Sequence, residues 1–276
     1  MKITSTILLS LALAPFASAV TTAINFGSLG SAGDGVTMDG VLLNEPGAIS
    51  AGGDFALGYS GSLRTTVAFQ SALNPVASSP FTIEFWAKPS AITDDNIGPS
   101  PVFNRPFTTN RSGWVFFQRS PGTGWNLRMF DGVGSNVGWD LTGGTNAAGV
   151  WSHVVAVWSG TAATLYVNGV LADDTNAAGR SGNYVGNTAA TISLGSYSDG
   201  SNPFAGAVDE FALYNTALTP TQISNHYALA SSPTPGAYAS AVIGDGAVEY
   251  LPVPEPTGVL LTAVGGLLLL RRKRQD

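Results

Sequence analysis

Few residues of this 276-residue chain could do acid–base or metal chemistry. The chain contains five glutamates, two histidines and no cysteine. Hydrolysis of a glycosidic bond needs two carboxyl groups that face one substrate. Asp209 and Glu210 are adjacent, and adjacent side chains of a strand point to opposite faces of the sheet. The sequence therefore predicts that this pair does not serve one substrate. The lack of cysteine excludes a disulfide framework, thiol catalysis and cysteine-based zinc sites.

The two histidines offer little for catalysis. A Ser-His-Asp site would have to use His153 or His226, and no serine stands in a Gly-x-Ser-x-Gly elbow. His153 lies in a segment that is apolar on both faces, so we expect a structural histidine. His226 is expected at the surface or at the edge of a helix. The count of two excludes a multi-histidine metal site, and no phosphate-binding or dinucleotide-binding glycine motif is present.

The elements that position the carboxylates and histidines are expected to be strands, because the sequence consists of short apolar runs with turn residues between them. The run FTIEFWAK at residues 81–88 places Phe, Ile, Phe and Ala on one face and Thr, Glu, Trp and Lys on the other, which predicts a strand with one face in the core. Asn168-Gly169 predicts a tight hairpin turn. Further strands are predicted at Gly113 to Arg119, Trp125 to Asp131, Trp151 to Trp158, Ala163 to Val167, Val170 to Ala172, Ala190 to Gly195 and Ala207 to Tyr214.

One helix is predicted in the body of the chain. Thr219 fits an N-cap, Pro220 the first helical position and Gln222 the capping-box position, and the helix should run to about Ala230. The region from Ala23 to Gln70 is expected to supply the first strands. Many short antiparallel strands with a single helix predict an all-β fold of two packed sheets.

Three segments carry a family resemblance: FTIEFWAKPS, WSHVVAVWSGTAATLYVNGVLA and ISLGSYSDGSNPFAGAVDEFALYNTALTPTQI. In this order and spacing they resemble a LamG-like domain of the concanavalin A-like lectin/glucanase superfamily over about Phe81 to Ala230. The resemblance implies an antiparallel jelly-roll sandwich with one short C-terminal helix, assigned here to residues 20–230. Glucanases of this superfamily carry Glu-x-Asp-x-x-Glu on one strand, and no glutamate of this chain stands in that pattern. We therefore expect a binding module and no enzyme.

The resemblance also implies a candidate calcium site. LamG-like domains often hold Ca²⁺ at a rim of the sandwich through Asp and Asn side chains and backbone carbonyls. Asp209 matches the family's closing Asp-Glu pair. An early strand usually supplies another ligand, but Ala56 to Phe69 contains no acid and only Asp54 stands upstream. The oxygen-rich loops Asp173 to Gly179 and Ser198 to Asn202 are predicted to be solvated turns.

Aromatic side chains near turns are candidates for stacking on a sugar ring. Trp125, Trp139 and Tyr197 are the residues so placed. By contrast, Trp86, Trp151 and Trp158 occupy strand positions of the family that the chain resembles and are predicted to lie in the core.

The two ends read as processing signals. Lys2, a short apolar run and the small residues Ala17 and Ala19 predict a signal peptide at residues 1–19 that signal peptidase removes. The other end holds an apolar run at 257–270, whose 14 residues would span about 21 Å as a helix, against a hydrocarbon core of about 30 Å. The motif before this run and the basic cluster after it consist of Val253, Pro254, Glu255 and Pro256, and of Arg271, Arg272, Lys273 and Arg274.

Together, residues 253–276 resemble a PEP-CTERM sorting tail. The resemblance implies that an exosortase-type enzyme cuts near the Pro-Glu-Pro motif after transient insertion of the tail in the membrane. A retained single-span anchor is the alternative. Residues 231–252 contain Pro233 and Pro235 and no helical period, so they are predicted to be a spacer, although Tyr238 to Leu251 could instead add a pair of strands.

The net charge of the body disfavours nucleic acids as partners. Without the two ends, seven basic residues face 16 acidic ones, a net charge near −9, which disfavours nucleic acid. We expect an exported protein, tethered to the membrane before processing and placed at the cell surface or in the extracellular matrix afterwards. There it would act as a non-catalytic binding module for carbohydrate or matrix components, with Ca²⁺ as a candidate ion. A structural surface protein without a ligand and a carbohydrate-active hydrolase are the alternatives.

Overall fold

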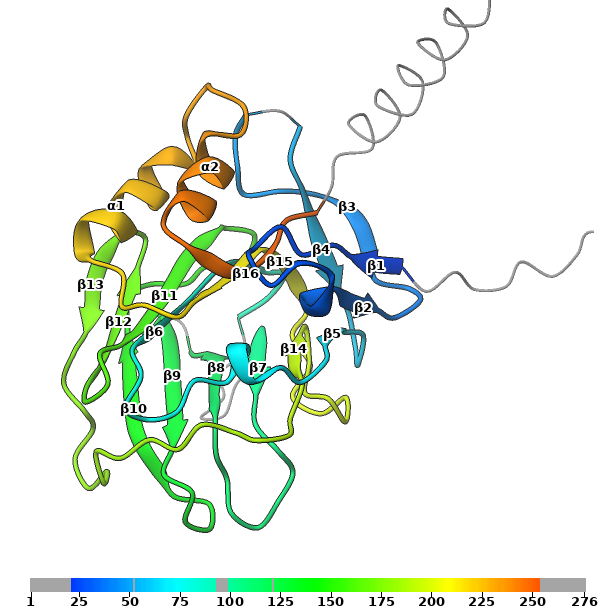
Figure 1. The fold of residues 1–276 in the computed structure, drawn as a ribbon. Coiled ribbons are helices and arrows are strands. Elements are labelled where there is room, and N and C mark those ends of the chain that lie inside the picture. Colours follow the sequence, from blue (N-terminus) through cyan, green and yellow to red (C-terminus); the bar gives the residue numbers. More distant parts are fainter. Residues whose placement is uncertain (1–20, 52, 93–98, 121, 254–276) are drawn as a thin grey trace, which may run out of the picture.

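The computed structural model describes residues 21–51, 53–92, 99–120 and 122–253, which form two packed antiparallel sheets with two short helices (Figure 1). The predicted all-β, two-sheet jelly-roll sandwich is confirmed. The signal peptide predicted at 1–19, and all but Val253 of the sorting tail predicted at 253–276, lie outside the described residues.

The first sheet, sheet A, contains eight strands, and every neighbouring pair is antiparallel. In spatial order they are β1 (Thr21–Ala23), β2 (Gly35–Thr37), β5 (Thr65–Val67), β14 (Ile192–Leu194), β7 (Val102–Asn104), β8 (Trp114–Gln118), β9 (Trp125–Phe130) and β10 (Val137–Gly143).

The second sheet, sheet B, also contains eight strands. Seven follow one another as β13 (Val170–Asp173), β12 (Ala163–Val167), β11 (Ser152–Trp158), β6 (Phe81–Pro89), β15 (Gly206–Tyr214), β4 (Phe55–Tyr59) and β3 (Leu42–Pro46). The eighth, β16 (Ala247–Leu251), pairs with β15. Because β15 lies between β6 and β4, the closing part of the domain occupies the middle of the sheet.

The main core lies between the sheets. Alternate side chains of the strands point into it, and Phe85 of β6 packs edge-to-face on Phe116 of β8 with ring centroids 4.9 Å apart. Trp125 of β9 is fully buried in the same cluster. Full burial of one large apolar side chain stabilises the fold by about 1.5–3 kcal/mol, so this cluster holds the two sheets together.

A second core lies on the outer face of sheet B. Helices α1 (Pro220–Leu229) and α2 (Ala237–Gly244) cover part of that face (Figure 1). Ile223, Tyr238 and Val242 of the helices pack with Trp86 and Tyr214 of the sheet. The prediction of one core face for residues 81–88 was therefore incomplete, because the helices bury the second face of β6 as well.

The predicted helix start is confirmed. The Thr219 side chain accepts a hydrogen bond from the backbone N–H of Gln222, the Gln222 side chain accepts from the Thr219 backbone, and Pro220 is the first helical residue. The strand predicted at 163–167 agrees with β12 in both bounds. The Asn168-Gly169 turn has the positive φ angles expected, 53° and 76°.

The prediction of a spacer over 231–252 was wrong for most of its length. Residues 237–244 form a second helix, which was not predicted, and residues 247–251 form β16. The alternative of a strand pair was half right, since β16 pairs with β15 and not with a neighbour inside the segment. The prolines stand before α2, and Tyr238 and Tyr250 are buried in the second core. The folded body therefore continues to Val253, which bridges to Phe55.

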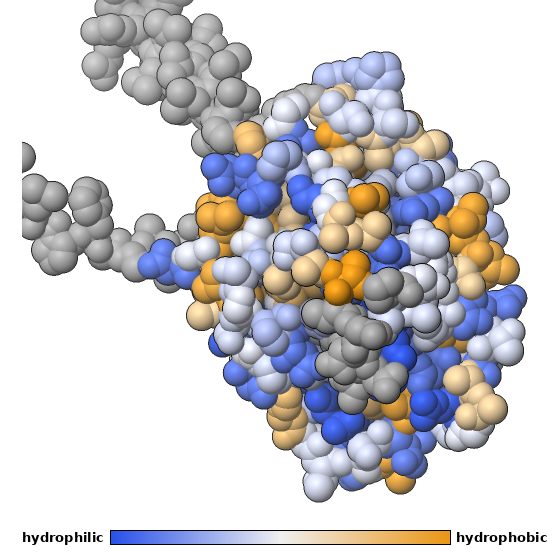
Figure 2. All heavy atoms as spheres, turned by 180° about the vertical axis from the view of Figure 1, so that it is seen from behind, coloured by the Kyte–Doolittle hydropathy of each residue, from blue (hydrophilic) through white to orange (hydrophobic). Residues whose placement is uncertain are grey.

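The remaining surface is mixed in character. On the face seen in Figure 2, hydrophobic residues form separate small patches between hydrophilic ones. Within the described ranges, neither helix has the length and hydropathy that a membrane crossing requires.

Candidate functional site

A groove crosses the outer face of sheet B beyond the area that the helices cover. It has a volume of about 290 Å³. Gly58 of β4 with Gly206 and Ala207 of β15 are small residues in its lining, and they leave space above the strands. A Cβ atom on Gly58 would come within 2.6 Å of the Glu45 side chain and 3.1 Å of Leu42. Glycine at this position therefore lets β3 and β4 lie close together.

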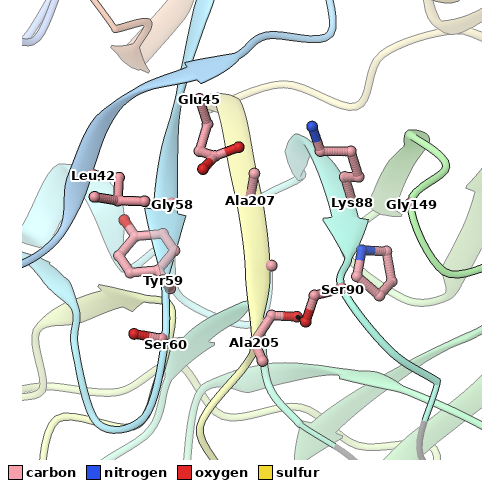
Figure 3. A pocket seen from close by; sticks show the side chains of 12 residues that line it. Leu42, Glu45, Gly58, Tyr59, Ser60, Lys88, Ser90, Gly149, Ala205 and Ala207 are labelled. Carbon is pink, nitrogen blue, oxygen red and sulfur yellow. Dashed lines mark hydrogen bonds between the residues drawn. The ribbon is translucent and has the colours of Figure 1, made fainter.

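One acidic, one basic and several hydroxyl side chains border this groove. Glu45 of β3 and Lys88 of β6 lie on either side of Ala207 (Figure 3). Lys88 Nζ donates a hydrogen bond to the Pro46 carbonyl oxygen at 3.4 Å and lies 4.9 Å from the ring centroid of Trp151. The hydroxyl groups of Ser60 and Ser90 add donors and acceptors. The rim is thus suited to a neutral ligand that is rich in hydroxyl groups.

An acidic cluster lies next along β15. The carboxylates of Asp54, Asp209 and Glu210 each offer an oxygen within 4.8 Å of the others. Asp209 and Glu210 are buried. The Asp209 carboxylate accepts hydrogen bonds from the backbone N–H groups of Ala48 and Glu210, both at 2.9 Å. Glu45 lines the groove, and the segment that follows it in the chain therefore covers the acidic cluster.

The prediction that Asp209 and Glu210 point to opposite faces was wrong. Glu210 has a φ of 52°, and the pairing of β15 with β6 shifts between Asp209 and Ala212. Such a β-bulge inserts an extra residue and turns its side chain. Both carboxylates consequently reach Asp54. No periodicity rule applied to the sequence could detect this local left-handed backbone.

The charges of this cluster repel one another in a dry environment. Burial, followed by the charges of Glu210 and Asp54, raises the pKa of Asp209 well above its usual value. Burial and the charge of Asp54 raise the pKa of Glu210 to about 8. The Tyr250 hydroxyl donates a hydrogen bond to Glu210, which only partly offsets the cost. A proton or a cation must therefore neutralise part of this cluster.

The donor set fits calcium. All three side chains present oxygen, and Ca²⁺ binds carboxylate oxygens at about 2.3–2.6 Å. Oxygens that share such an ion lie at most about 5 Å apart, and the observed limit of 4.8 Å agrees with that spacing. Asp209 is the residue that the sequence singled out, and Asp54, noted only as an upstream acid, lies beside it. Glu210 was missed because its face was assigned wrongly.

A separate polar network joins the helices to sheet B. Glu84 of β6 is fully buried, and its carboxylate accepts hydrogen bonds from Tyr214 and Tyr238, both at 2.8 Å. It also lies 2.7 Å from His153 Nε2 and 3.0 Å from His226 Nδ1. His226 is buried, so its predicted place at the surface was wrong.

The network keeps Glu84 charged. Burial alone would raise the pKa of Glu84, but hydrogen bonds with His153 and His226 and their charges lower it below its usual range. Burial alone would lower the pKa of His226, whereas the bonds and charges of Glu84 and Asp245 raise it. Nothing in this network lines the groove, so it is a structural element, as expected for His153.

The three aromatic candidates do not form a sugar platform together. Trp125 is fully buried, so its predicted exposure was wrong. Trp139 is half-buried, packs on Trp158 and donates its indole N–H to the Gly182 carbonyl oxygen at 2.7 Å. Tyr197 is buried on the outer face of sheet A but borders a second cavity there. Position near a turn did not reveal exposure, because tertiary packing decides it: Trp125 points into the core between the sheets.

The two oxygen-rich loops serve as turns. Asp173 accepts hydrogen bonds from the backbone N–H groups of Thr142 and Thr175, and Asp199 accepts from both the N–H and the hydroxyl of Ser201. These bonds stabilise local loop conformation.

Comparison with known protein families shows which family the chain belongs to. The family described as the concanavalin A-like lectin/glucanases superfamily matches residues 57–224, which is more than half of the chain. The protein belongs to this family. The match includes β6 and β15 and extends into the first turn of α1, whereas β3, which carries Glu45, lies before it. No curated protein is similar to this chain in sequence.

Solved structures support the same fold. The crystal structure of botulinum neurotoxin serotype D binding domain has a TM-score of 0.54 and 17% identity, covering 75% of this chain and 51% of that chain. The binding domain of Paraclostridial Mosquitocidal Protein 1 has a TM-score of 0.53 and 19% identity, with coverages of 75% and 51%. The chain thus spans about half the length of these structures, and the similarity defines its architecture.

Proposed function

We propose that this protein is an exported, non-catalytic module that binds extracellular carbohydrate in the groove between Glu45 and Lys88. The observation that carries the proposal is the groove itself, an open hollow over small residues with charged and hydroxyl groups on its border. Sugar hydroxyl groups are both donors and acceptors, so they pair well with such mixed borders. Membership of a family of lectins and glucanases agrees with this ligand class.

Binding is favoured over hydrolysis by the position of the carboxylates. Glu45 is the one carboxylate among the described residues that line the groove. Asp209 and Glu210 are buried below the segment that follows β3. Two carboxyl groups on opposite sides of a scissile bond are needed for glycoside hydrolysis, and this groove presents one.

Calcium would act as a structural ion in this proposal. Asp54, Asp209 and Glu210 would hold it, and its positive charge would offset most of their negative charge. The ion would fix the segment that includes Ala48, and therefore the position of Glu45 at the groove border. No chemical step is assigned to the ion.

A glycan array with and without Ca²⁺ tests the proposal. We expect wild-type protein to bind a restricted set of glycans, and Lys88→Ala and Glu45→Gln to weaken that binding at least tenfold. Asp39→Asn, which changes an exposed acid, is the matched control and should bind as wild type does. Lack of glycan binding in both conditions would refute the lectin function and favour a structural surface protein.

The hydrolase alternative has its own assay. Extracellular polysaccharide from the producing cell is incubated with wild-type protein and with Glu210→Gln and Glu84→Gln. We expect no release of reducing ends above the buffer rate. Release that Glu210→Gln abolishes would replace the binding module with an enzyme.

We also propose that both ends are processed. The signal peptide would be removed after Ala19, and the tail would be cut near Pro254-Glu255-Pro256. Such a cut would leave Val253, which is paired with Phe55, as part of the released domain. Mass spectrometry of protein from the producing cell tests this. A full-length C-terminus that includes Arg271 to Arg274 in the mature protein would favour the retained anchor.

A further inference from the structure

A second cavity lies on the opposite side of the sandwich from the groove. It occupies the outer face of sheet A and has a volume of about 260 Å³. Its lining combines three arginines with four aromatic rings. These residues are Arg105, Arg111, Arg128, Phe107, Phe117, Phe130 and Tyr197.

The cavity is rich in positive charge, although the body of the protein has a negative net charge. Three of the body's seven basic residues meet in this cavity, while 16 acidic residues make the body strongly negative. Arg105 is only 7% exposed. Its guanidinium lies 5.2–5.6 Å from the ring centroids of Phe103, Phe107, Phe130 and Tyr197. The rings hold the guanidinium in place through cation–π contacts.

The arginines retain unused capacity for an anion. Among the described residues, no carboxylate forms an ion pair with Arg105 or Arg111, whereas Asp140 lies 3.5 Å from Arg128 and also pairs with Arg180. Burial, then the charge of Arg111, lowers the pKa of Arg105, and Tyr197, followed by the charge of Asp199, opposes this only in part. A buried arginine has five N–H donors, and Arg105 gives one weak bond, at 3.5 Å, to the Pro106 carbonyl oxygen in addition to its contact with Tyr197.

The aromatic residues add a surface for a sugar ring. Phe107 is 49% exposed and lies 6.0 Å from Tyr197, measured between ring centroids. Burial raises the pKa of Tyr197 to about 12, with Arg105 as the main opposing influence, so the phenol is a neutral hydrogen-bonding group at physiological pH. An apolar face beside a cationic group suits a sugar that carries an acid.

We propose that this cavity is a second glycan-binding site, selective for the anionic groups of an acidic polysaccharide. The arginines would pair with a carboxylate or sulfate, and Phe107 would contact the ring that bears it. The site does not depend on the groove between Glu45 and Lys88, although its sugar specificity rests on the carbohydrate-binding function proposed above. With sites on opposite faces, one molecule could join two polysaccharide chains.

Isothermal titration calorimetry at low ionic strength tests this site. The probes are tetragalacturonate, a sulfated dextran oligosaccharide, maltotetraose as the neutral control, and sodium sulfate or sodium acetate as free anions. We expect one or both anionic oligosaccharides to bind, and binding to weaken as salt screens the charges. Arg111→Gln should weaken binding at least tenfold, while the groove variant Lys88→Ala should leave it unchanged.

Several results would overturn the proposal. These are no binding of either anionic oligosaccharide, unchanged binding by Arg111→Gln, or equal affinity for the free anions. Arg111 is used because it is half-buried, and substitution of the buried Arg105 could impair folding. A further variant tests whether the arginines pair with a carboxylate of the chain itself and not with an external anion. It carries both Asp94→Asn and Asp95→Asn, at two positions outside the described residues. Binding seen only in that variant would mean that the chain supplies its own anion, which contradicts an external ligand.

Discussion

The acidic cluster makes folding stability depend on pH in a way that Glu210→Gln should remove. Glu210 has a pKa of about 8 in the folded protein, against 4.5 as its usual value. The folded protein therefore holds this proton more tightly than the unfolded chain does. The free energy of unfolding consequently falls as the pH rises from 4.5 towards 8.

The magnitude follows from these two pKa values. Linkage gives a loss of about 3–4 kcal/mol between pH 5 and pH 8 for this one group. Asp209, His226 and Glu249 change stability in the same direction, because their pKa values are raised as well. The informative quantity is thus the difference between wild type and Glu210→Gln. The amide oxygen of glutamine still accepts the hydrogen bond from Tyr250, but it carries no charge.

Urea denaturation in EDTA, followed at pH 5, 6, 7 and 8, measures this difference. We expect the wild-type free energy of unfolding to fall by about 3–4 kcal/mol more than that of Glu210→Gln. Asp39→Asn should follow the wild type. Added Ca²⁺ should raise wild-type stability most at pH 8, where the ionised carboxylates can bind it, and should have little effect on Glu210→Gln. Parallel pH profiles for wild type and Glu210→Gln would refute the reasoning.

Three further predictions concern the helices on sheet B. Glu84→Leu removes the acceptor shared by two histidines and two tyrosines and should cost about 3–5 kcal/mol in urea denaturation; a cost below about 1 kcal/mol would contradict the buried network. Thr219→Ala removes the capping box and should cost about 1 kcal/mol, whereas Ser224→Ala on the exposed side of α1 should cost clearly less. Truncation after Ala230 removes α2 and β16 and should abolish cooperative unfolding, whereas truncation after Val253 should preserve it; equal stability of the two would restore the spacer interpretation.

Much of the fold could be predicted because it depends on local pattern. The alternation at 81–88, the turn at Asn168-Gly169 and the capping residues at Thr219 each act over a few positions. Residues 237–251 could not be predicted in the same way. Their helix has neither a side-chain cap nor a charged first turn, and burial of Tyr238 beneath Trp86 and Glu84 stabilises it. That stabilisation comes from residues about 150 positions away in the chain.

For the candidate sites as well, some features follow from the sequence and others only from tertiary contacts. Composition determined that cysteine chemistry and multi-histidine metal centres are excluded, since these depend only on which residues are present. The sequence also named Asp209 as an acid that could bind calcium. Only the tertiary structure decided that Glu210 turns to the same side, because that depends on a bulge between β15 and β6. Only the tertiary structure brought Arg105, Arg111 and Arg128 into one cavity, because strand pairing in sheet A, and not spacing along the chain, sets which side chains meet.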